Sequence, residues 1–335
     1  MKIYPAVMLA LIIAALTSPI PSTAREATLA NPAKWQATLE ANHPLIGKIW
    51  STKKNDFVEP SALLDDLKLK KFILLGETHD NPDHHWLQAS IIEALTNMNR
   101  KPNLVMEMVN VNQMRPMTLY RASNTATAKG LGTAIGWTQQ GWPDWSLYLP
   151  IGQQIMTHDL RVFPGSAAPY MTRSLIKSKL SLLPKKAIEI FQLDKPLEPA
   201  LQKSLIDELK VVHCNHLPVK MIEPMSLIQR FRDAWMADVL IQAEDGGENP
   251  AVLIAGSGHT RTDRGVPWYL RHRDEKDSYV SIHFLGAVKG QNSIEELLEK
   301  DPSGNPTADY IWITPDVARK DPCQQILKNL KEKKS

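Results

Sequence analysis

KKFILLGETHDNPDHHWLQ, residues 70–88, is the stretch that decides the fold. Its four consecutive apolar residues, 72–75, predict a strand buried on both faces, which is typical of a parallel sheet covered by helices on both sides. Gly76 lets the chain turn out of this strand, and Asn81 followed by Pro82 then predicts the start of a helix. The stretch therefore indicates an α/β protein, in which polar turns at the carboxyl ends of strands commonly build the site.

Two glutamates and two histidines are expected to meet at the carboxyl ends of three strands. Glu77 and His79 lie two residues apart in an extended exit, so their side chains point the same way. A second apolar strand precedes His259 in AVLIAGSGH, and the strand NLVMEM carries Glu107 near its carboxyl end. If these three strands are neighbours in the sheet, the four side chains share one pocket.

Three interpretations of this group of four residues stay open. Carboxylates and imidazoles are donors that suit Zn, Mn or Fe, and a bound divalent ion would activate water for hydrolysis, with a spare glutamate as general base. The same residues could instead hold a ligand without catalysis. In the purely structural interpretation, Glu77 caps helix amides, and His79 and His259 satisfy one another or backbone carbonyls.

Six motifs in one order resemble the ChaN family of haem-binding uptake proteins, which belongs with the Tiki, TraB and erythromycin-esterase proteins. The motifs lie between residues 71 and 315 and read GETHDNPDHHWLQ, VMEM, HCNHLP, RDAWMA, AGSGH with a trailing GVP, and DYIWITP. The resemblance implies an α/β fold with a helical lobe, a periplasmic or outer-membrane location, and haem handling in bacterial iron uptake. We expect a mostly parallel central sheet flanked by helices, with a smaller helical lobe over approximately residues 169–245, which lack strong strand patterns.

Tyr148 is the candidate haem ligand in this sequence. It shares one helical face with Ile151 and Ile155, so its side chain is expected to point inwards. A phenol oxygen is an established axial donor to ferric haem, whereas the alternative is a core tyrosine with a hydrogen-bonded hydroxyl. The resemblance implies that a tyrosine holds haem, with help from histidine and lysine across a homodimer that encloses it.

His213 and His216 in HCNHLP are candidate helpers in haem binding. They lie three residues apart, a spacing suited to two ligands on one helix face, although Pro218 indicates that the helix is ending. A local metal site with Cys214 is a weaker interpretation, because metal sites usually have three or four protein ligands. An imidazole that holds haem or its propionates fits the family motif better.

The functional prediction is a periplasmic haem-binding protein of haem and iron uptake, with no catalytic residues. An outer-membrane haem receptor is a further partner that the resemblance implies and that the sequence itself does not support. The alternative is a metal-dependent hydrolase, similar to a protease or an esterase. Related Tiki proteins are described as metalloproteases built on two G-x-x-H elements plus glutamate, and this sequence has both elements, GETH and GSGH.

Composition sets the limits within which these predictions stand. At 335 residues, with 43% hydrophobic and 22% charged residues, the chain is long enough for one large domain or two small ones. Membrane-protein and disordered classes are excluded for the mature part. A formal net charge of +3 is too small to indicate nucleic acid as a partner. We expect a single ChaN-like domain over residues 25–335.

Residues 1–24 have the pattern of a cleaved signal peptide. Lys2 is their only charged residue, and small residues precede the predicted cleavage site after Ala24. The apolar core, residues 6–16, is shorter than the roughly 20 residues that a membrane-spanning helix needs, which disfavours an anchor. No cysteine follows this core, so, unlike the lipoproteins of the family, the mature protein is expected to be periplasmic or secreted without lipidation.

Three further expectations concern the rest of the chain. Cys214 and Cys323 are its two cysteines, and in an oxidising compartment they either pair or remain two buried thiols. Residues 25–60, with scattered prolines and polar residues, predict an irregular lead-in with a few turns of helix. A Met and aromatic stripe in the helical lobe is expected to be core packing, with an apolar wall for a porphyrin as the alternative; it comprises Ile228, Phe231, Trp235, Met236, Val239 and Leu240.

Overall fold

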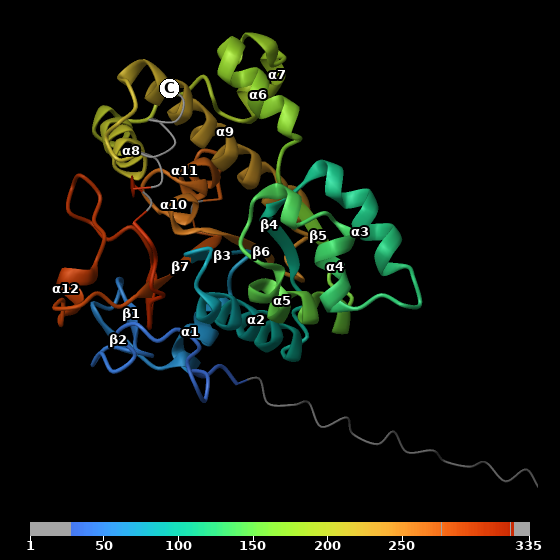
Figure 1. Cartoon of the computed structure of the whole chain (residues 1–335), viewed down its shortest axis with the longest axis vertical. Coiled ribbons are helices and arrows are strands. Elements are labelled where there is room, and N and C mark those ends of the chain that lie inside the picture. The colour runs from blue at the N-terminus through green and yellow to red at the C-terminus, as the bar shows by residue number, and fades with distance from the viewer. Residues whose placement is uncertain (1–27, 276, 322, 325–335) are drawn as a thin grey trace, which may run out of the picture.

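The computed structural model describes residues 28–275, 277–321 and 323–324 of the chain (Figure 1). Its centre is a sheet in the strand order β2-β1-β8-β7-β3-β6-β4-β5, in which every neighbouring pair from β8 to β5 is parallel. The predicted α/β fold with a mostly parallel sheet is therefore confirmed. The strands are β1 (Ile49–Ser51), β2 (Asp56–Val58), β3 (Phe72–Glu77), β4 (Asn103–Asn110), β5 (Val162–Ser166), β6 (Ala251–Gly256), β7 (Tyr279–Gly286) and β8 (Tyr310–Thr314).

Helices cover both faces of this sheet (Figure 1). Ile73 and Leu75 of β3 belong to the apolar cluster on one face, which also includes buried residues of α1, α2 and α5. Phe72 and Leu74 of the same strand belong to the cluster on the other face, with α9 and α11. All six residues of β3 are buried, as expected of a central parallel strand.

The α-helices are α1 (Pro60–Leu67), α2 (Pro82–Asn97), α3 (Met114–Arg121), α4 (Ala128–Ala134), α5 (Trp145–Thr157), α6 (Pro169–Ser178), α7 (Lys185–Ile190), α8 (Pro199–Val212), α9 (Val219–Ala243), α10 (Ser257–Thr260), α11 (Val266–Arg271) and α12 (Ile294–Leu297). Short 3-10 helices are η1 (Val111–Gln113), η2 (Thr138–Gln140) and η3 (Lys179–Leu182). The predicted start of α2 is confirmed, because the Asn81 side chain accepts a hydrogen bond from the Asp83 amide and Pro82 is the first helical residue. Between β5 and β6, the described residues form helices α6 to α9 and contain no strand.

The N-terminal part of the domain differs from its prediction. Residues 25–60 were expected to be irregular with a few turns of helix, but they contain β1 and β2, and the prediction is wrong there. β1 pairs antiparallel with both β2 and β8, so it extends the sheet beyond the parallel strands. Each of these strands has only three residues, too few to show an alternating pattern.

Cys214 and Cys323 form a disulfide, with their Cα atoms 5.5 Å apart. The bond joins the turn after α8 to the segment that follows β8, so the two cysteines are paired and the thiol alternative is wrong. Within the described ranges, no helix combines the length and the apolar character needed to cross a membrane. The predicted signal peptide lies outside the described residues.

Candidate functional site

The four residues of the predicted pocket lie together at the carboxyl edge of the sheet. β6 pairs with β3 on one side and with β4 on the other, which confirms that the three strands are neighbours. His79 Nδ1 is 2.7 Å from Glu77 Oε1, and His79 Nε2 is 3.9 Å from Glu107 Oε2. His259 Nε2 lies 3.4 Å from Glu107 Oε1. Carboxylates and imidazoles thus alternate across the ends of three strands.

Glu77 is the buried acceptor at one end of this group. The Tyr148 hydroxyl donates to its Oε1 at 2.8 Å, and His85 Nδ1 lies 2.8 Å from its Oε2. Burial by itself would raise the pKa of Glu77, but the His85 and His79 imidazoles outweigh it and hold the pKa well below its usual range. Burial lowers the pKa of His79, but the hydrogen bond with Glu77 and the charge of Glu107 raise it overall. Glu77 is therefore an ionised carboxylate at neutral pH.

Glu107 is buried at the centre of the group. It accepts hydrogen bonds from the Gly256 amide, at 2.8 Å, and from the Arg232 guanidinium. Burial opposes its ionisation, but the positive charges of His259 and Arg232 hold the pKa of Glu107 well below its usual range. The carboxylate is therefore charged and fully paired.

His259 completes the group from the first turn of α10. Its Nδ1 lies 2.5 Å from Asp233 Oδ1, so the imidazole sits between the carboxylates of Asp233 and Glu107. Burial alone would lower the pKa of His259, but Glu107 and Asp233 together raise it to about 9. Desolvation raises the pKa of Asp233 itself. At neutral pH, His259 is therefore an imidazolium enclosed by acidic groups.

Gly76 was expected to turn the chain out of the strand, but it lies inside β3, paired with Ala255, and its role is to leave room for a neighbouring helix. A Cβ atom there would lie 2.2 Å from Thr260 Oγ1 and 2.9 Å from His283 Cδ2, which is closer than real side chains approach. Only glycine therefore lets α10, which carries His259, pack this closely against β3.

Sequence reasoning did not single out Arg232, Asp233 or His85. All three lie inside motifs that carry the family resemblance, RDAWMA and HDNPDHHWLQ. Arg232 and Asp233 are charged residues of α9, and α9 packs against β4, β5 and β6. Charged residues on a helix that covers the sheet were the signal that could have identified them, because buried charges require partners.

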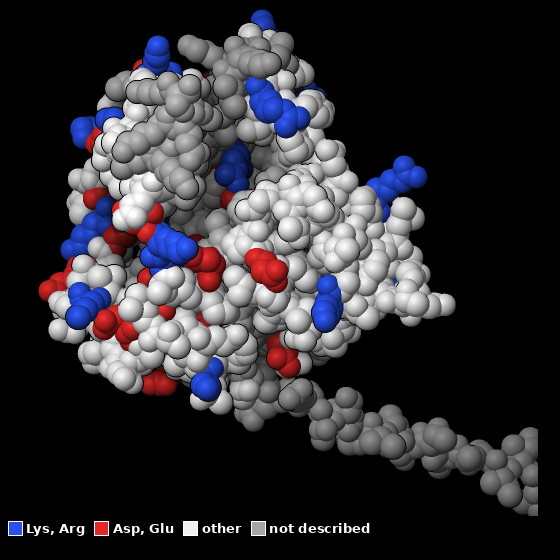
Figure 2. All heavy atoms as spheres, in the orientation of Figure 1, with Lys and Arg blue, Asp and Glu red and all other residues white. Residues whose placement is uncertain are grey.

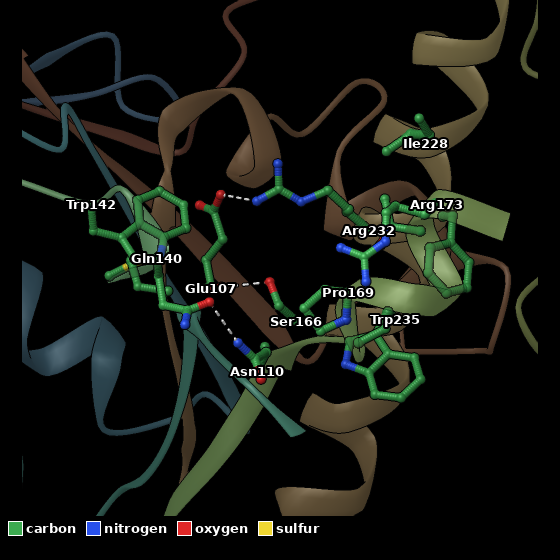
Figure 3. Close-up of a pocket in the computed structure, with 15 residues that line it drawn as sticks. Glu107, Asn110, Gln140, Trp142, Ser166, Pro169, Arg173, Ile228, Arg232 and Trp235 are labelled. Atoms are coloured by element: carbon green, nitrogen blue, oxygen red, sulfur yellow. Dashed lines mark hydrogen bonds and ion pairs between the residues drawn. The ribbon is translucent and has the colours of Figure 1, made fainter. Parts of the chain in front are cut away.

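A cavity of about 390 Å³ opens beside Glu107. Figure 3 shows Arg232 and Arg173 reaching into it, with Trp142 on the side opposite to α9. The surface is hollowed in this region, and a basic side chain is visible inside the hollow (Figure 2). Most of the exposed lining is apolar, and its residues are Glu107, Met108, Asn110, Gln140, Trp142, Gly165, Ser166, Ala167, Pro169, Thr172, Arg173, Ile228, Phe231, Arg232 and Trp235.

The Met and aromatic stripe of α9 is divided between the core and the cavity, and its service as a wall for a porphyrin stays a prediction. Met236, Val239 and Leu240 are buried in the core, as expected of packing residues. Ile228, Phe231 and Trp235 line the cavity. The carboxyl-terminal part of this face of α9 therefore packs in the core. The part nearer the start of the helix lines the cavity.

Tyr148 points inwards, as its helical face predicts. It is completely buried, its ring centroid lies 3.9 Å from that of His85 and 4.7 Å from that of Trp137, and its hydroxyl is bound to Glu77. Burial and the charge of Glu77 raise its pKa strongly. To ligate iron, Tyr148 would have to give up its hydrogen bond to Glu77 and bind the metal through the same oxygen. The role of Tyr148 as a haem ligand stays a prediction.

His213 and His216 lie in the segment between α8 and α9. α8 ends at Val212 and His213 is its C-cap, so the helix ends here, as Pro218 indicated, and the two histidines do not share a helix face. His213 Nδ1 is 2.8 Å from the carbonyl oxygen of Leu209, and neither histidine lines the cavity beside Glu107. Their part in haem binding stays a prediction.

The predicted metal site is not found in the described part of the chain. No group of three or more His, Cys, Asp or Glu side chains has an arrangement that could hold a metal ion there. The oxygens of Glu77 and Glu107 instead bind Tyr148, Arg232 and the Gly256 amide directly. Zn, Mn or Fe at this group, and a hydrolase that depends on it, therefore gain no support from these residues.

Comparison with known proteins places this site in a family. The model of the family described as haem-binding uptake, Tiki superfamily, ChaN matches residues 63–270. No curated protein matches the chain in sequence.

One solved structure shows the same fold, and two others resemble the chain less. The structure of ChaN of Campylobacter jejuni with cofacially bound haem has a TM-score of 0.59 and 20% identity, covering 79% of this chain and 95% of its own. An erythromycin esterase in its open conformation has a TM-score of 0.41 and 15% identity, covering 88% of this chain and 87% of its own. A succinoglycan biosynthesis protein has a TM-score of 0.41 and 13% identity, covering 78% and 74%. Because the family match spans more than half of its residues, the chain belongs to the ChaN family of haem-binding uptake proteins in the Tiki superfamily.

Proposed function

We propose that this chain binds haem in the cavity beside Glu107 and serves haem and iron uptake. The observation that carries the proposal is membership of a haem-binding uptake family over residues 63–270, a range that contains every residue lining the cavity. The cavity's volume of about 390 Å³ lies within the roughly 300–1,000 Å³ common for sites of small molecules and cofactors.

The chemistry of the cavity supports a flat, apolar ligand with acidic groups. Trp142 and Trp235 offer aromatic surface to a macrocycle, and Arg173 and Arg232 offer positive charge to carboxylates. Haem has both properties, since its porphyrin is apolar and its two propionates are anionic. The apolar lining would cover part of the porphyrin, and an axial ligand would set the properties of the iron.

An extracytoplasmic location is part of the proposal. The Cys214–Cys323 disulfide supports it, because structural disulfides persist in oxidising compartments such as the periplasm and are rare in the cytosol. We propose a periplasmic or secreted protein that is processed near Ala24. A homodimer that encloses haem, and delivery of haem from an outer-membrane receptor, belong to the same proposal through the family.

The first test is a haem titration of the purified chain. We expect saturable binding with a defined stoichiometry, seen as a Soret band that survives removal of free haem on a desalting column. Weak uptake that never saturates, and a spectrum equal to that of free haem, would falsify the proposal.

The role of Tyr148, which binds Glu77 and does not line the cavity beside Glu107, is tested by Tyr148→Phe, with Tyr120→Phe as the matched control. If the phenol ligates iron, the variant is expected to shift the ferric charge-transfer band or to abolish binding, because phenylalanine has no donor atom. Tyr120 has its hydroxyl at Thr127, and its loss is expected to leave the spectrum unchanged. An unaltered spectrum in Tyr148→Phe would remove Tyr148 from the iron and leave it as the donor to Glu77.

A further inference from the structure

We propose that Arg173 and Arg232 form a pair of carboxylate-binding residues, so that the cavity selects apolar ligands carrying two carboxylates. This inference rests on the proposed haem function and names the part of the ligand that these residues recognise. It makes Arg173 a specificity-determining residue of the site.

Arg232 is the inner member of the pair. Its Nη2 binds the buried carboxylate of Glu107, and its side chain retains 29% exposure at the cavity. A guanidinium has five N–H donors in a fixed fork, so one contact with Glu107 leaves donors for a second carboxylate. Glu107 also has His259 as a positive neighbour, so it remains paired when Arg232 shares its charge with a ligand.

Arg173 is the outer member of the pair. It is an exposed residue of α6 that lines the cavity, and no hydrogen bond or ion pair joins its guanidinium to another described residue. Figure 3 shows its side chain directed into the same cavity as that of Arg232. The positive charge of Arg173 is therefore available to a ligand, whereas the charge of Arg232 is partly neutralised by Glu107.

The apolar walls decide which anions fit this pair. Trp235 on α9 and Trp142 across the cavity face the space that the two arginines border. A small anion such as phosphate would leave this apolar surface exposed to water, whereas a porphyrin would cover it. The arrangement therefore favours two carboxylates on one edge of a large apolar ring, each received by a guanidinium through charge-assisted hydrogen bonds.

The test compares four ligands on three proteins. The ligands are haem, haem dimethyl ester, protoporphyrin IX and protoporphyrin IX dimethyl ester, whose ester forms keep the ring and lose both charges. The proteins are the wild type, Arg173→Met and Arg115→Met. Arg115 is an exposed arginine of α3 outside the cavity, and its replacement removes the same charge.

We expect wild-type protein and Arg115→Met to prefer each free acid over its ester by about tenfold or more, and Arg173→Met to lose about tenfold in affinity for the free acids only. Equal affinities of Arg173→Met and wild type for the free acids, or no preference of the wild type over the esters, would overturn this inference while haem binding stands. Binding of protoporphyrin IX with that preference, but no haem ligation spectrum, would support the carboxylate site and remove the iron ligand from the proposed function. Failure of the wild type to bind either ring overturns both.

Discussion

Replacing Glu107 with alanine is expected to lower the free energy of unfolding by about 3–5 kcal/mol. Glu107 is buried, and its carboxylate faces the imidazole of His259 and the guanidinium of Arg232. It also accepts the amide hydrogen of Gly256. The substitution leaves two positive charges without their shared counter-charge in a poorly solvated position, and it leaves a backbone donor unpaired.

Urea denaturation followed by far-UV circular dichroism measures this loss. Glu107→Gln keeps the volume and one acceptor, so it is expected to be destabilised less than the alanine variant and to give a folded protein if alanine does not. Glu295→Ala, at an exposed position in α12, is the control and should stay within about 0.5 kcal/mol of the wild type. If Glu107→Ala also remained within 1 kcal/mol of the wild type, Glu107 would not be the counter-charge of this site.

The sheet around Glu107 was predictable because its signals are local. The apolar runs of β3 and β6 and the cap at Asn81 depend on a few adjacent residues. The meeting of Glu77, Glu107 and His259 follows from the rule that carboxyl ends of parallel strands share one edge. That β6 lies between β3 and β4 was a condition of the prediction, since neighbour relations depend on crossovers that no local pattern encodes.

Local sequence patterns could not predict which distant residues bind these side chains. The helical face of Tyr148 predicted burial, but its hydroxyl meets Glu77, 71 residues earlier in the chain. The pairing of Cys214 and Cys323 spans 109 residues and likewise depends on how distant parts of the chain pack together. His213 and His216 show a different limit of sequence patterns. Their i,i+3 spacing would place them on one face of a helix, but α8 ends at Val212, before either residue. Spacing is informative only where the element that carries it continues.

The stability of the fold is expected to peak near pH 6.5 and to fall by about 3 kcal/mol toward pH 9 because of His259. Glu107 and Asp233 raise its pKa to about 9, against an ordinary value of 6.5. The stabilisation from this charge is therefore complete below pH 6.5 and is lost as the pH rises through about 9. His79 and His85, whose pKa values are also raised, act in the same direction.

Two other buried histidines set the acidic side of this maximum. Burial lowers the pKa of His84 to about 3 and that of His283 to about 4, so both are neutral in the folded protein at pH 5 and charged in the unfolded chain. The stability that these two neutral histidines contribute is present above pH 6.5 and is lost as the pH falls below that value. The maximum of stability therefore lies between this loss at acidic pH and the loss caused by His259 at alkaline pH.

Denaturant unfolding from pH 6.5 to 9.5 tests the alkaline side of the curve. His259→Gln removes the titrating group and keeps a polar side chain, so the variant is expected to start less stable and to lose less stability over this range. His158→Gln, at a half-exposed position outside the site, is expected to follow the wild-type slope. Parallel slopes for His259→Gln and the wild type would show that His259 is not charged between Asp233 and Glu107, and the charge pairing assigned to Glu107 would then rest on Arg232 alone.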